Sequence, residues 1–227
     1  LEAGTCLIRL EPTKADGLAN VDFLLVRGPA VIPGECSQAP TITISIPACQ
    51  GKAIQYKTNS GAWISETRLK TRSAGQWSDD PQLNTLDANK SWLQFDLSGI
   101  AGTITSATLT IYAITGDKSY VVNGLNDGVE ETWSADTIDW FSAPGNDTAS
   151  GTALNTSQTV WLYTVNPTVA DGPASGDVTS FVKTDTDGLV TFILTPGGTT
   201  YLYNVLEGSY YNPDYVPVLT LEGEFTL

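Results

Sequence analysis

Alternating apolar residues within positions 92–113 constrain the fold of this chain more than any other feature of its sequence. Two short runs, joined by a turn at Ser98-Gly99, carry apolar side chains at regular short intervals. Because successive side chains of a β-strand point to opposite faces, this pattern indicates two half-buried strands. The residues predicted to face the core are Leu93, Phe95 and Leu97 in the first run, and Ile104, Ala107, Leu109 and Ile111 in the second.

The rest of the chain supports an all-β fold. Its 227 residues are rich in Thr, Ser, Gly and Val, and turn signals recur at intervals of about ten residues. No stretch shows a helical period, and no apolar run approaches the ~20 residues that a membrane span needs. We predict a two-sheet antiparallel β-sandwich of the jelly-roll type over residues 51–227. The alternating tail, residues 219–227, is predicted to pair within a sheet.

Residues 1–50 are predicted to form an N-terminal β extension. The segment holds all three cysteines and a strand-like run at residues 41–46. It is too short and too loosely patterned for a core of its own. The extension therefore either adds strands to the sandwich or reaches onto a neighbouring molecule.

Five motifs in a fixed order give the chain a family resemblance. They lie at residues 92–145, 175–182, 187–194, 204–209 and 216–221. With these motifs the chain resembles the DNRLRE domain family, a secreted jelly-roll type that overlaps carbohydrate-binding module family ninety-six. The resemblance implies a jelly roll that binds polysaccharide. The arginines of the family's naming motif are absent from this sequence.

The net charge of the chain limits the classes of molecule that it can bind. The formal net charge is −14, with 11 lysines and arginines against 25 acidic residues. Nucleic acid is excluded as a partner because phosphate binding needs a cationic surface. The same repulsion disfavours polyanionic glycans such as alginate. The chain begins at Leu1 and contains no methionine, from which we expect a processed, secreted protein that is extracellular or bound to the cell surface.

The cysteines fit an oxidising compartment. A disulfide between Cys36 and Cys49 would close a short loop and stabilise the fold by about 2–4 kcal/mol. A bridge from Cys6 to Cys49 is the open alternative, as are three reduced thiols. With three cysteines, one stays unpaired or bridges to another molecule.

Catalysis is not predicted. Histidine is absent, which removes the commonest general base and the commonest metal ligand. Glycoside hydrolysis needs two carboxylates, for which Glu130, Glu131 and Asp136 are the candidates. Acidic loop residues of an acidic protein are ordinarily solvated, so we predict that the protein is not an enzyme.

Aromatic residues are the candidates for sugar stacking, because a flat ring matches the C–H face of a pyranose. For Trp133 and Trp140 the alternative is that both rings plug one end of the core. The full candidate set is Trp77, Trp133, Trp140, Tyr210, Tyr211 and Tyr215.

Two acidic segments are candidates for a structural calcium ion, which takes six to eight oxygen ligands. One contains Asp185 and Asp187, and the other spans residues 123–131. For the first segment, the alternative is that its Asp-Gly pair only forms a turn between strands. Three Asn-x-Ser/Thr triplets make Asn89, Asn146 and Asn155 candidate glycosylation sites.

Two functions follow from these observations. The first is a self-associating structural subunit of an extracellular fibre, surface layer or matrix, assembled by exchange of terminal strands. The second, implied by the resemblance, is a polysaccharide-binding module of a glycan-degrading or adhesion system. In the first function the partner is another copy of the chain.

Overall fold

A computed structural model describes residues 41–55, 68–72, 88–116, 119–166, 172–197, 199–203 and 213–226. All of them lie in one compact unit, Thr41–Leu227. Residues 1–40 of the predicted extension lie outside the described residues. Among the described helices, none is long and apolar enough to cross a membrane.

The described residues form eleven strands and two short helical segments. In chain order these are β1 (Ile42–Pro47), β2 (Gln50–Gln55), β3 (Arg68–Arg72), β4 (Asn89–Asp96), β5 (Ala101–Gly116), β6 (Tyr120–Leu125), β7 (Thr159–Val165), β8 (Gly172–Asp177), α2 (Thr179–Val182), β9 (Leu189–Pro196), β10 (Thr199–Tyr203), η1 (Pro213–Tyr215) and β11 (Val218–Thr226).

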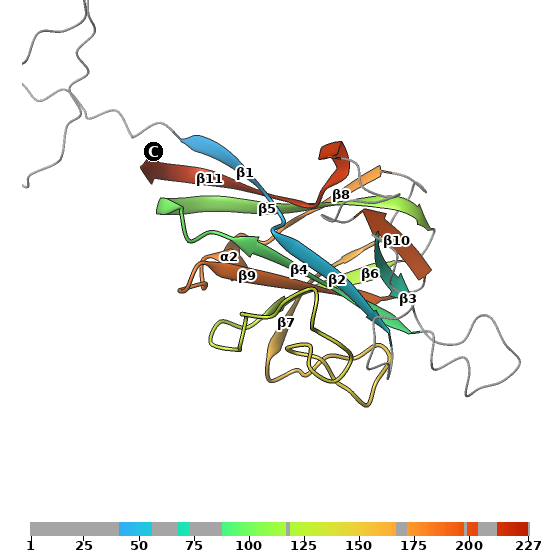
Figure 1. Ribbon diagram of the computed structural model, residues 1–227. Helices are drawn as coiled ribbons and strands as arrows, with labels where there is room; N and C mark the ends of the chain where they lie inside the picture. Colours follow the sequence, from blue (N-terminus) through green and yellow to red (C-terminus); the bar gives the residue numbers. More distant parts are fainter. Residues whose placement is uncertain are drawn as a thin grey trace, which may run out of the picture. The chain divides into compact units, whose positions relative to one another are not determined.

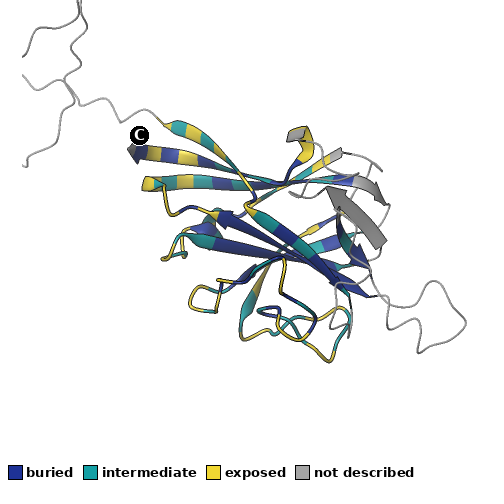
Figure 2. Cartoon of the chain, viewed as in Figure 1, coloured by how far each residue is buried: buried dark blue, intermediate teal, exposed yellow. Residues whose placement is uncertain are grey.

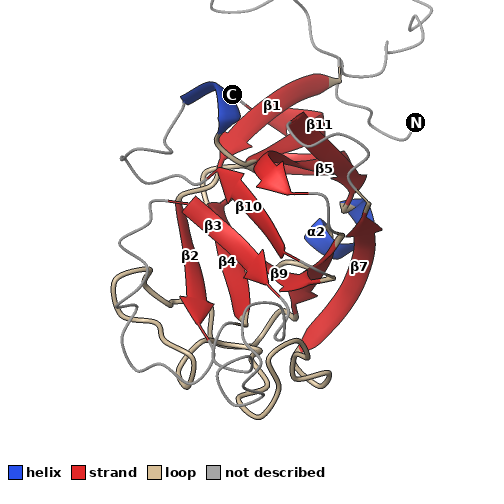
Figure 3. Cartoon of the chain, turned by 90° about the vertical axis from the view of Figure 1, so that its right-hand side faces the viewer, coloured by secondary structure: helices blue, strands red, loops and turns tan. Residues whose placement is uncertain are grey.

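The strands form two antiparallel sheets that pack face to face, which confirms the predicted β-sandwich. One sheet has the order β1-β11-β5-β8, and the other has β2 beside β4 and then β9, β6 and β7 (Figure 1). At one margin β10 pairs with both β5 and β3 and joins the two sheets. Figure 3 shows β2, β3, β4 and β10 from that side.

The main core lies between the two sheets. Leu93, Phe95 and Leu97 face it from the second sheet, and Ala107, Leu109 and Ile111 face it from the first, as the alternation predicts. Ile104 packs against the same core but is only partly buried. The spacing of three between Ile104 and Ala107 has a structural cause. Opposite Glu222 and Gly223 the pairing skips Thr105, and this bulge shifts the phase of β5 by one residue.

The second sheet is also buried on its outer face. Figure 2 shows β4 and β9 buried along almost their whole length, and six consecutive residues of β9 after Leu189 are buried or nearly so. Trp92 of β4 and Ile193 of β9 point away from the main core into a second apolar cluster. Residues 126–158, which connect β6 to β7 and which we call the covering loop, supply the other side of that cluster.

A buried lysine fixes the covering loop to β4. Lys90 is fully buried, and its Nζ donates to Asn146 Oδ1 at 2.8 Å and to the carbonyl oxygens of Ser150 at 2.8 Å and Ala153 at 2.5 Å. The ammonium also lies 4.5 Å from the centre of the Trp140 ring. Desolvation lowers the pKa of Lys90 to about 7. The carbonyl oxygens of the loop replace the water that this cation has lost.

Both ends of the described unit pair within the sheet. β1 pairs with β11 along its whole length, and β11 continues against β5 as far as Thr226. Residues 41–50 of the predicted extension therefore join their own sandwich. Cys49 is a free thiol whose Sγ donates to the carbonyl oxygen of Gln94 at 3.3 Å. Cys49 therefore forms neither the predicted disulfide with Cys36 nor the alternative one with Cys6. Cys6 and Cys36 themselves lie outside the described residues.

Candidate functional site

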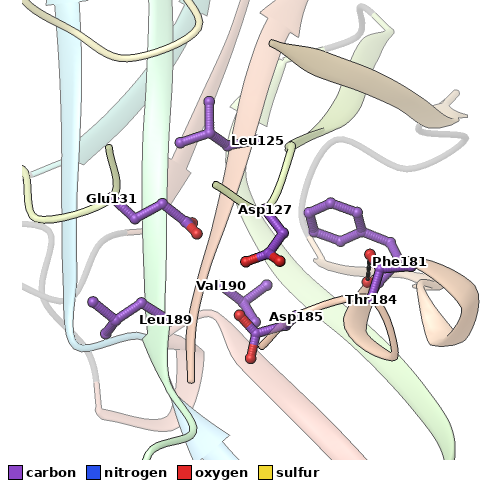
Figure 4. Close-up of a pocket in the computed structure, with 8 residues that line it drawn as sticks. All are labelled: Leu125, Asp127, Glu131, Phe181, Thr184, Asp185, Leu189 and Val190. Carbon is purple, nitrogen blue, oxygen red and sulfur yellow. Dashed lines mark hydrogen bonds between the residues drawn. The ribbon is translucent and has the colours of Figure 1, made fainter. Parts of the chain in front are cut away.

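Four carboxylates gather at one end of the second sheet. Asp127 and Glu131 follow β6, and Asp185 and Asp187 precede β9. Since β6 and β9 are antiparallel neighbours, the end of one lies beside the start of the other. One oxygen atom from each carboxylate lies within 4.8 Å of the other three. The two acidic segments that the sequence singles out separately thus form one cluster, which we call the acidic site (Figure 4).

The segment before β9 is a tight turn that aims its carboxylates. Asp185 Oδ2 accepts a hydrogen bond from the backbone N–H of Gly188 at 3.0 Å, and Asp187 Oδ1 accepts one from that of Leu189 at 2.9 Å. Gly188 has φ of +84°, and a Cβ there would lie 2.8 Å from the backbone of Ser98, so glycine is required. Across the site, Thr186 Oγ1 donates to Asp127 Oδ2 at 2.8 Å.

Glu131 is the most enclosed member of the acidic site. Only 4% of its surface is exposed, and its Oε1 atom has no hydrogen-bond partner. Its backbone carbonyl accepts from Gln94 Nε2 at 2.5 Å, which holds the residue against β4. The pKa of Glu131 is raised to about 7, chiefly by burial and in part by the nearby charges of Asp187 and Asp185, against hydrogen bonds with Thr191 that lower it. Burial likewise raises the pKa of Asp185 to about 6.

The raised pKa of Glu131 predicts that stability falls as pH rises. The folded protein holds this proton more tightly than the unfolded chain does, so unfolding becomes easier as pH rises from about 4.5 through 7. In buffer free of divalent cations, we expect the free energy of unfolding to fall by about 2 kcal/mol between about pH 5 and 7. Urea titrations at several pH values measure it.

Glu131→Gln is the control for this prediction, because it removes the titrating group and keeps the shape. Its stability should fall clearly less than that of the wild type over the same interval, and the fall that remains comes from Asp185, whose pKa is also raised. The pH interval ends at 7 because of Lys90, whose pKa is lowered in the folded protein. Above about pH 7 its titration makes the free energy of unfolding rise with pH, which is opposite to the effect of Glu131. A wild-type stability that is flat or rises from pH 5 to 7 would contradict the assignment.

An open groove lies beside the acidic site. It has a volume of about 740 Å³ and is lined by residues of β7, of α2 and of the turn after β6. Trp161 is 63% exposed in this groove, and its neighbour Val160 is 41% exposed. Leu162, Val178 and Phe181 also line it, and the polar residues of its lining are Asn126, Asp127, Asp177, Thr179, Ser180 and Thr184. We call this surface the Trp161 groove.

The aromatic residues predicted to stack on sugar lie elsewhere. Trp133 and Trp140 are 7% and 0% exposed, so a sugar ring has no access to them. Their prediction as stacking platforms is wrong, because the covering loop buries both in the second apolar cluster, and their indole N–H groups donate to Thr191 Oγ1 and the Thr148 carbonyl. Tyr215 is 40% exposed, and its ring centroid lies 5.3 Å from that of Tyr112. Trp77, Tyr210 and Tyr211 lie outside the described residues.

Two residues of the site escape prediction from sequence. Trp161 lies in a run of four consecutive apolar or aromatic residues, 160–163, and nothing in that run distinguishes it from its neighbours. Its exposure follows from the position of β7 as the last strand of its sheet. Glu131 is conspicuous in sequence only as half of an acidic pair.

The acidic pair is not arranged for glycoside hydrolysis. Glu130 is exposed, and its Oε1 accepts hydrogen bonds from the backbone and hydroxyl of Thr132. Glu131 faces a cavity of about 10 Å³, far below the ~300 Å³ of the smallest ligand pockets. A sugar ring therefore cannot reach both carboxylates.

The predicted glycosylation sites differ in their access. Asn89 is 4% exposed within β4, so it cannot carry a glycan in the folded protein, and that prediction is wrong. The Asn146 Nδ2 group, to which a glycan would be attached, already donates to the Trp140 carbonyl oxygen within the covering loop at 2.6 Å. Asn155 is partly exposed, and its Oδ1 accepts from the backbone N–H of Ser157 at 3.1 Å. Asn155 stays a prediction.

Comparison with known families gives one match. The sequence model of carbohydrate-binding module family 96 matches residues 54–221. That span runs from the end of β2 into β11 and includes the covering loop, the acidic site and the Trp161 groove. None of the curated proteins matches the chain.

Proposed function

Because this chain belongs to carbohydrate-binding module family 96, we propose that it is a non-catalytic module that binds polysaccharide in the Trp161 groove. The observation that carries the proposal is the exposed indole of Trp161 at the wall of a groove of about 740 Å³. Large aromatic side chains are ordinarily buried in a β-sandwich. An exposed one beside polar side chains is typical of a binding surface.

The groove offers the two kinds of contact that a sugar chain needs. The flat face of an indole packs against the C–H groups of a pyranose ring, while its edge remains in water. Ser180 and Asn126 carry a hydroxyl and an amide group that can pair with sugar hydroxyls. The Thr179 hydroxyl is already engaged, because it donates to Asp177 Oδ1 at 2.6 Å and accepts from the Ala107 backbone N–H at 2.8 Å. Asp177 Oδ1 already accepts from the Thr179 backbone N–H at 2.9 Å, so this part of the wall is held in place.

Electrostatics favour a neutral polysaccharide. The chain has a net charge of −14, and Asp127 and Asp177 line the groove itself. A polyuronate or a sulfated glycan would be repelled by the net charge of the chain and by the two carboxylates in the groove. We therefore place the ligand among neutral glycans, and the module outside the cell, where such polymers occur.

Replacing Trp161 by alanine tests the proposal. In affinity gel electrophoresis against a panel of neutral polysaccharides, we expect the wild-type protein to be retarded by at least one of them. Trp161→Ala should weaken that binding about tenfold or more, because removal of a central aromatic contact commonly costs over 1 kcal/mol.

Phe141→Ala is the matched control, since Phe141 is also exposed, at 54%, but does not line the groove. Its retardation should equal that of the wild type. Binding of alginate in preference to every neutral glycan, or equal retardation of Trp161→Ala and the wild type, would overturn the proposal.

Self-association by terminal strand exchange has less support. The described part of the predicted extension pairs in cis, β1 with β11 and β2 with β4. The family match points to ligand binding instead. Size-exclusion chromatography of the whole chain separates the two functions, because a module that works alone elutes as a monomer at every concentration.

A further inference from the structure

We propose that Asp127, Glu131, Asp185 and Asp187 bind one calcium ion at the end of the second sheet. The proposal goes beyond polysaccharide binding and does not depend on it. Figure 4 shows Asp127, Glu131 and Asp185 around a common space between the turn after β6 and the turn before β9.

The separation of the four carboxylates fits one ion. Oxygen ligands lie about 2.4 Å from calcium, so two ligands on opposite sides of the ion are about 4.8 Å apart. The four carboxylate oxygens of the acidic site lie within 4.8 Å of one another. All four can therefore reach the same coordination shell, and solvent supplies the remaining positions.

Glu131 provides the second, independent indication. A carboxylate that is almost fully buried ordinarily finds a hydrogen-bond donor for each oxygen, because an unpaired buried acceptor destabilises the fold. Glu131 is 4% exposed, and its Oε1 has none. Among the residues that the structure describes, no arginine or lysine lines the cavity that Glu131 faces. A cation in that cavity would satisfy the oxygen and offset the repulsion among four acidic groups.

The size and chemistry of the cavity select the ion. Its volume of about 10 Å³ corresponds to a single water-sized sphere. The acidic residues that meet there offer oxygen and neither sulfur nor imidazole, which suits a hard cation rather than zinc or copper. The ligands come from two turns of unequal length rather than from one rigid loop, and calcium tolerates such irregular geometry better than magnesium.

The site would connect two parts of the molecule. Asp127 and Glu131 lie at the start of the covering loop, whereas Asp185 and Asp187 lie between α2 and β9. Asp127, Phe181 and Thr184 line both the small cavity and the Trp161 groove. An ion bound here would therefore hold one wall of the groove against the sheet.

Calcium titration of the cation-free protein tests the proposal. After dialysis against EDTA and then buffer, we expect isothermal titration calorimetry with CaCl₂ to show one site per chain. At about 1 mM calcium the Tm should rise by about 5 °C, because an ion that binds only the folded state stabilises it. Magnesium at the same concentration should have a smaller effect.

Two isosteric variants make the test specific. Glu131→Gln should lower calcium affinity at least about tenfold and abolish the calcium-induced rise in Tm, while its own Tm in EDTA should equal or exceed that of the wild type. Glu130→Gln changes the exposed neighbour and should bind calcium as the wild type does. A Glu131→Gln variant that loses calcium affinity but keeps or gains Tm in EDTA identifies Glu131 as a ligand. A residue that only supports the fold would lower the Tm in EDTA when it is replaced.

The proposal is overturned if the wild-type protein shows no calcium heat and no shift in Tm, or if Glu131→Gln binds calcium as tightly as the wild type. Since sugar is absent from the titration, its outcome is separate from that of the Trp161 experiment. If the protein binds calcium but no glycan, only the proposed function is refuted. If it binds glycan but shows no calcium binding, and EDTA does not change its glycan binding, only the calcium site is refuted.

Discussion

Replacing Lys90 by methionine should lower the free energy of unfolding by about 3 kcal/mol at about pH 6, where the ammonium is charged. Methionine fills a similar volume, but it leaves Asn146 Oδ1 and the carbonyls of Ser150 and Ala153 without their donor. These acceptors lie inside the covering loop, so the loop should loosen before the sandwich does. Urea denaturation measures the stability, and hydrogen exchange over residues 126–158 measures the loosening.

Lys183→Met is the control for the Lys90 variant. Lys183 is exposed, and its Nζ has one long contact of 3.5 Å to the carbonyl of Thr105. Surface substitutions of this kind change stability by about 0.5 kcal/mol or less. If Lys90→Met were as stable as Lys183→Met, the buried ammonium would not be what fastens the loop.

Replacing Phe192 by alanine should be at least as severe, with a loss of about 4 kcal/mol. Phe192 is fully buried at the centre of β9, and its ring centroid lies 5.7 Å from that of Phe95 and 5.5 Å from that of Phe181. Alanine would remove the middle ring of the three and leave a cavity between the sheets. Thermal unfolding followed by circular dichroism measures the loss.

The same substitution at the surface provides the comparison for Phe192. Phe141→Ala removes an equally large ring that is 54% exposed on the covering loop, and it should cost less than about 1 kcal/mol. Since Phe181 also lines the Trp161 groove, Phe192→Ala should weaken glycan binding as well. Equal stabilities for the two alanine variants would show that the three rings are not central to the core.

The sequence predicts the sandwich because alternation is a local signal. Leu93 and Phe95 must face one side of a strand whatever the rest of the chain does, and Leu109 and Ile111 obey the same rule. The outer cluster is not predictable in this way. Trp92 and Ile193 fall on the face that alternation assigns to solvent, and only the covering loop, which is irregular, explains their burial.

The site depends on sheet order, which no local pattern encodes. The segments around Asp127 and Asp185 are each recognisable as acidic turns, yet they meet only because β6 and β9 are neighbours. Trp133 and Trp140 mislead for the same reason, since a tryptophan in a polar loop has the same local sequence whether it is open to solvent or covered. Trp161 differs from them by lying on the last strand of the sheet.

The covering loop is attached to β4 mainly through its own backbone. Trp92 Nε1 donates to the carbonyl oxygen of Pro144 at 2.9 Å, and Lys90 Nζ donates to the carbonyl oxygens of Ser150 and Ala153 in addition to the Asn146 side chain. Backbone oxygens are present whatever side chains the loop carries. We therefore expect substitutions at the outward corners of this loop to leave its attachment to β4 intact.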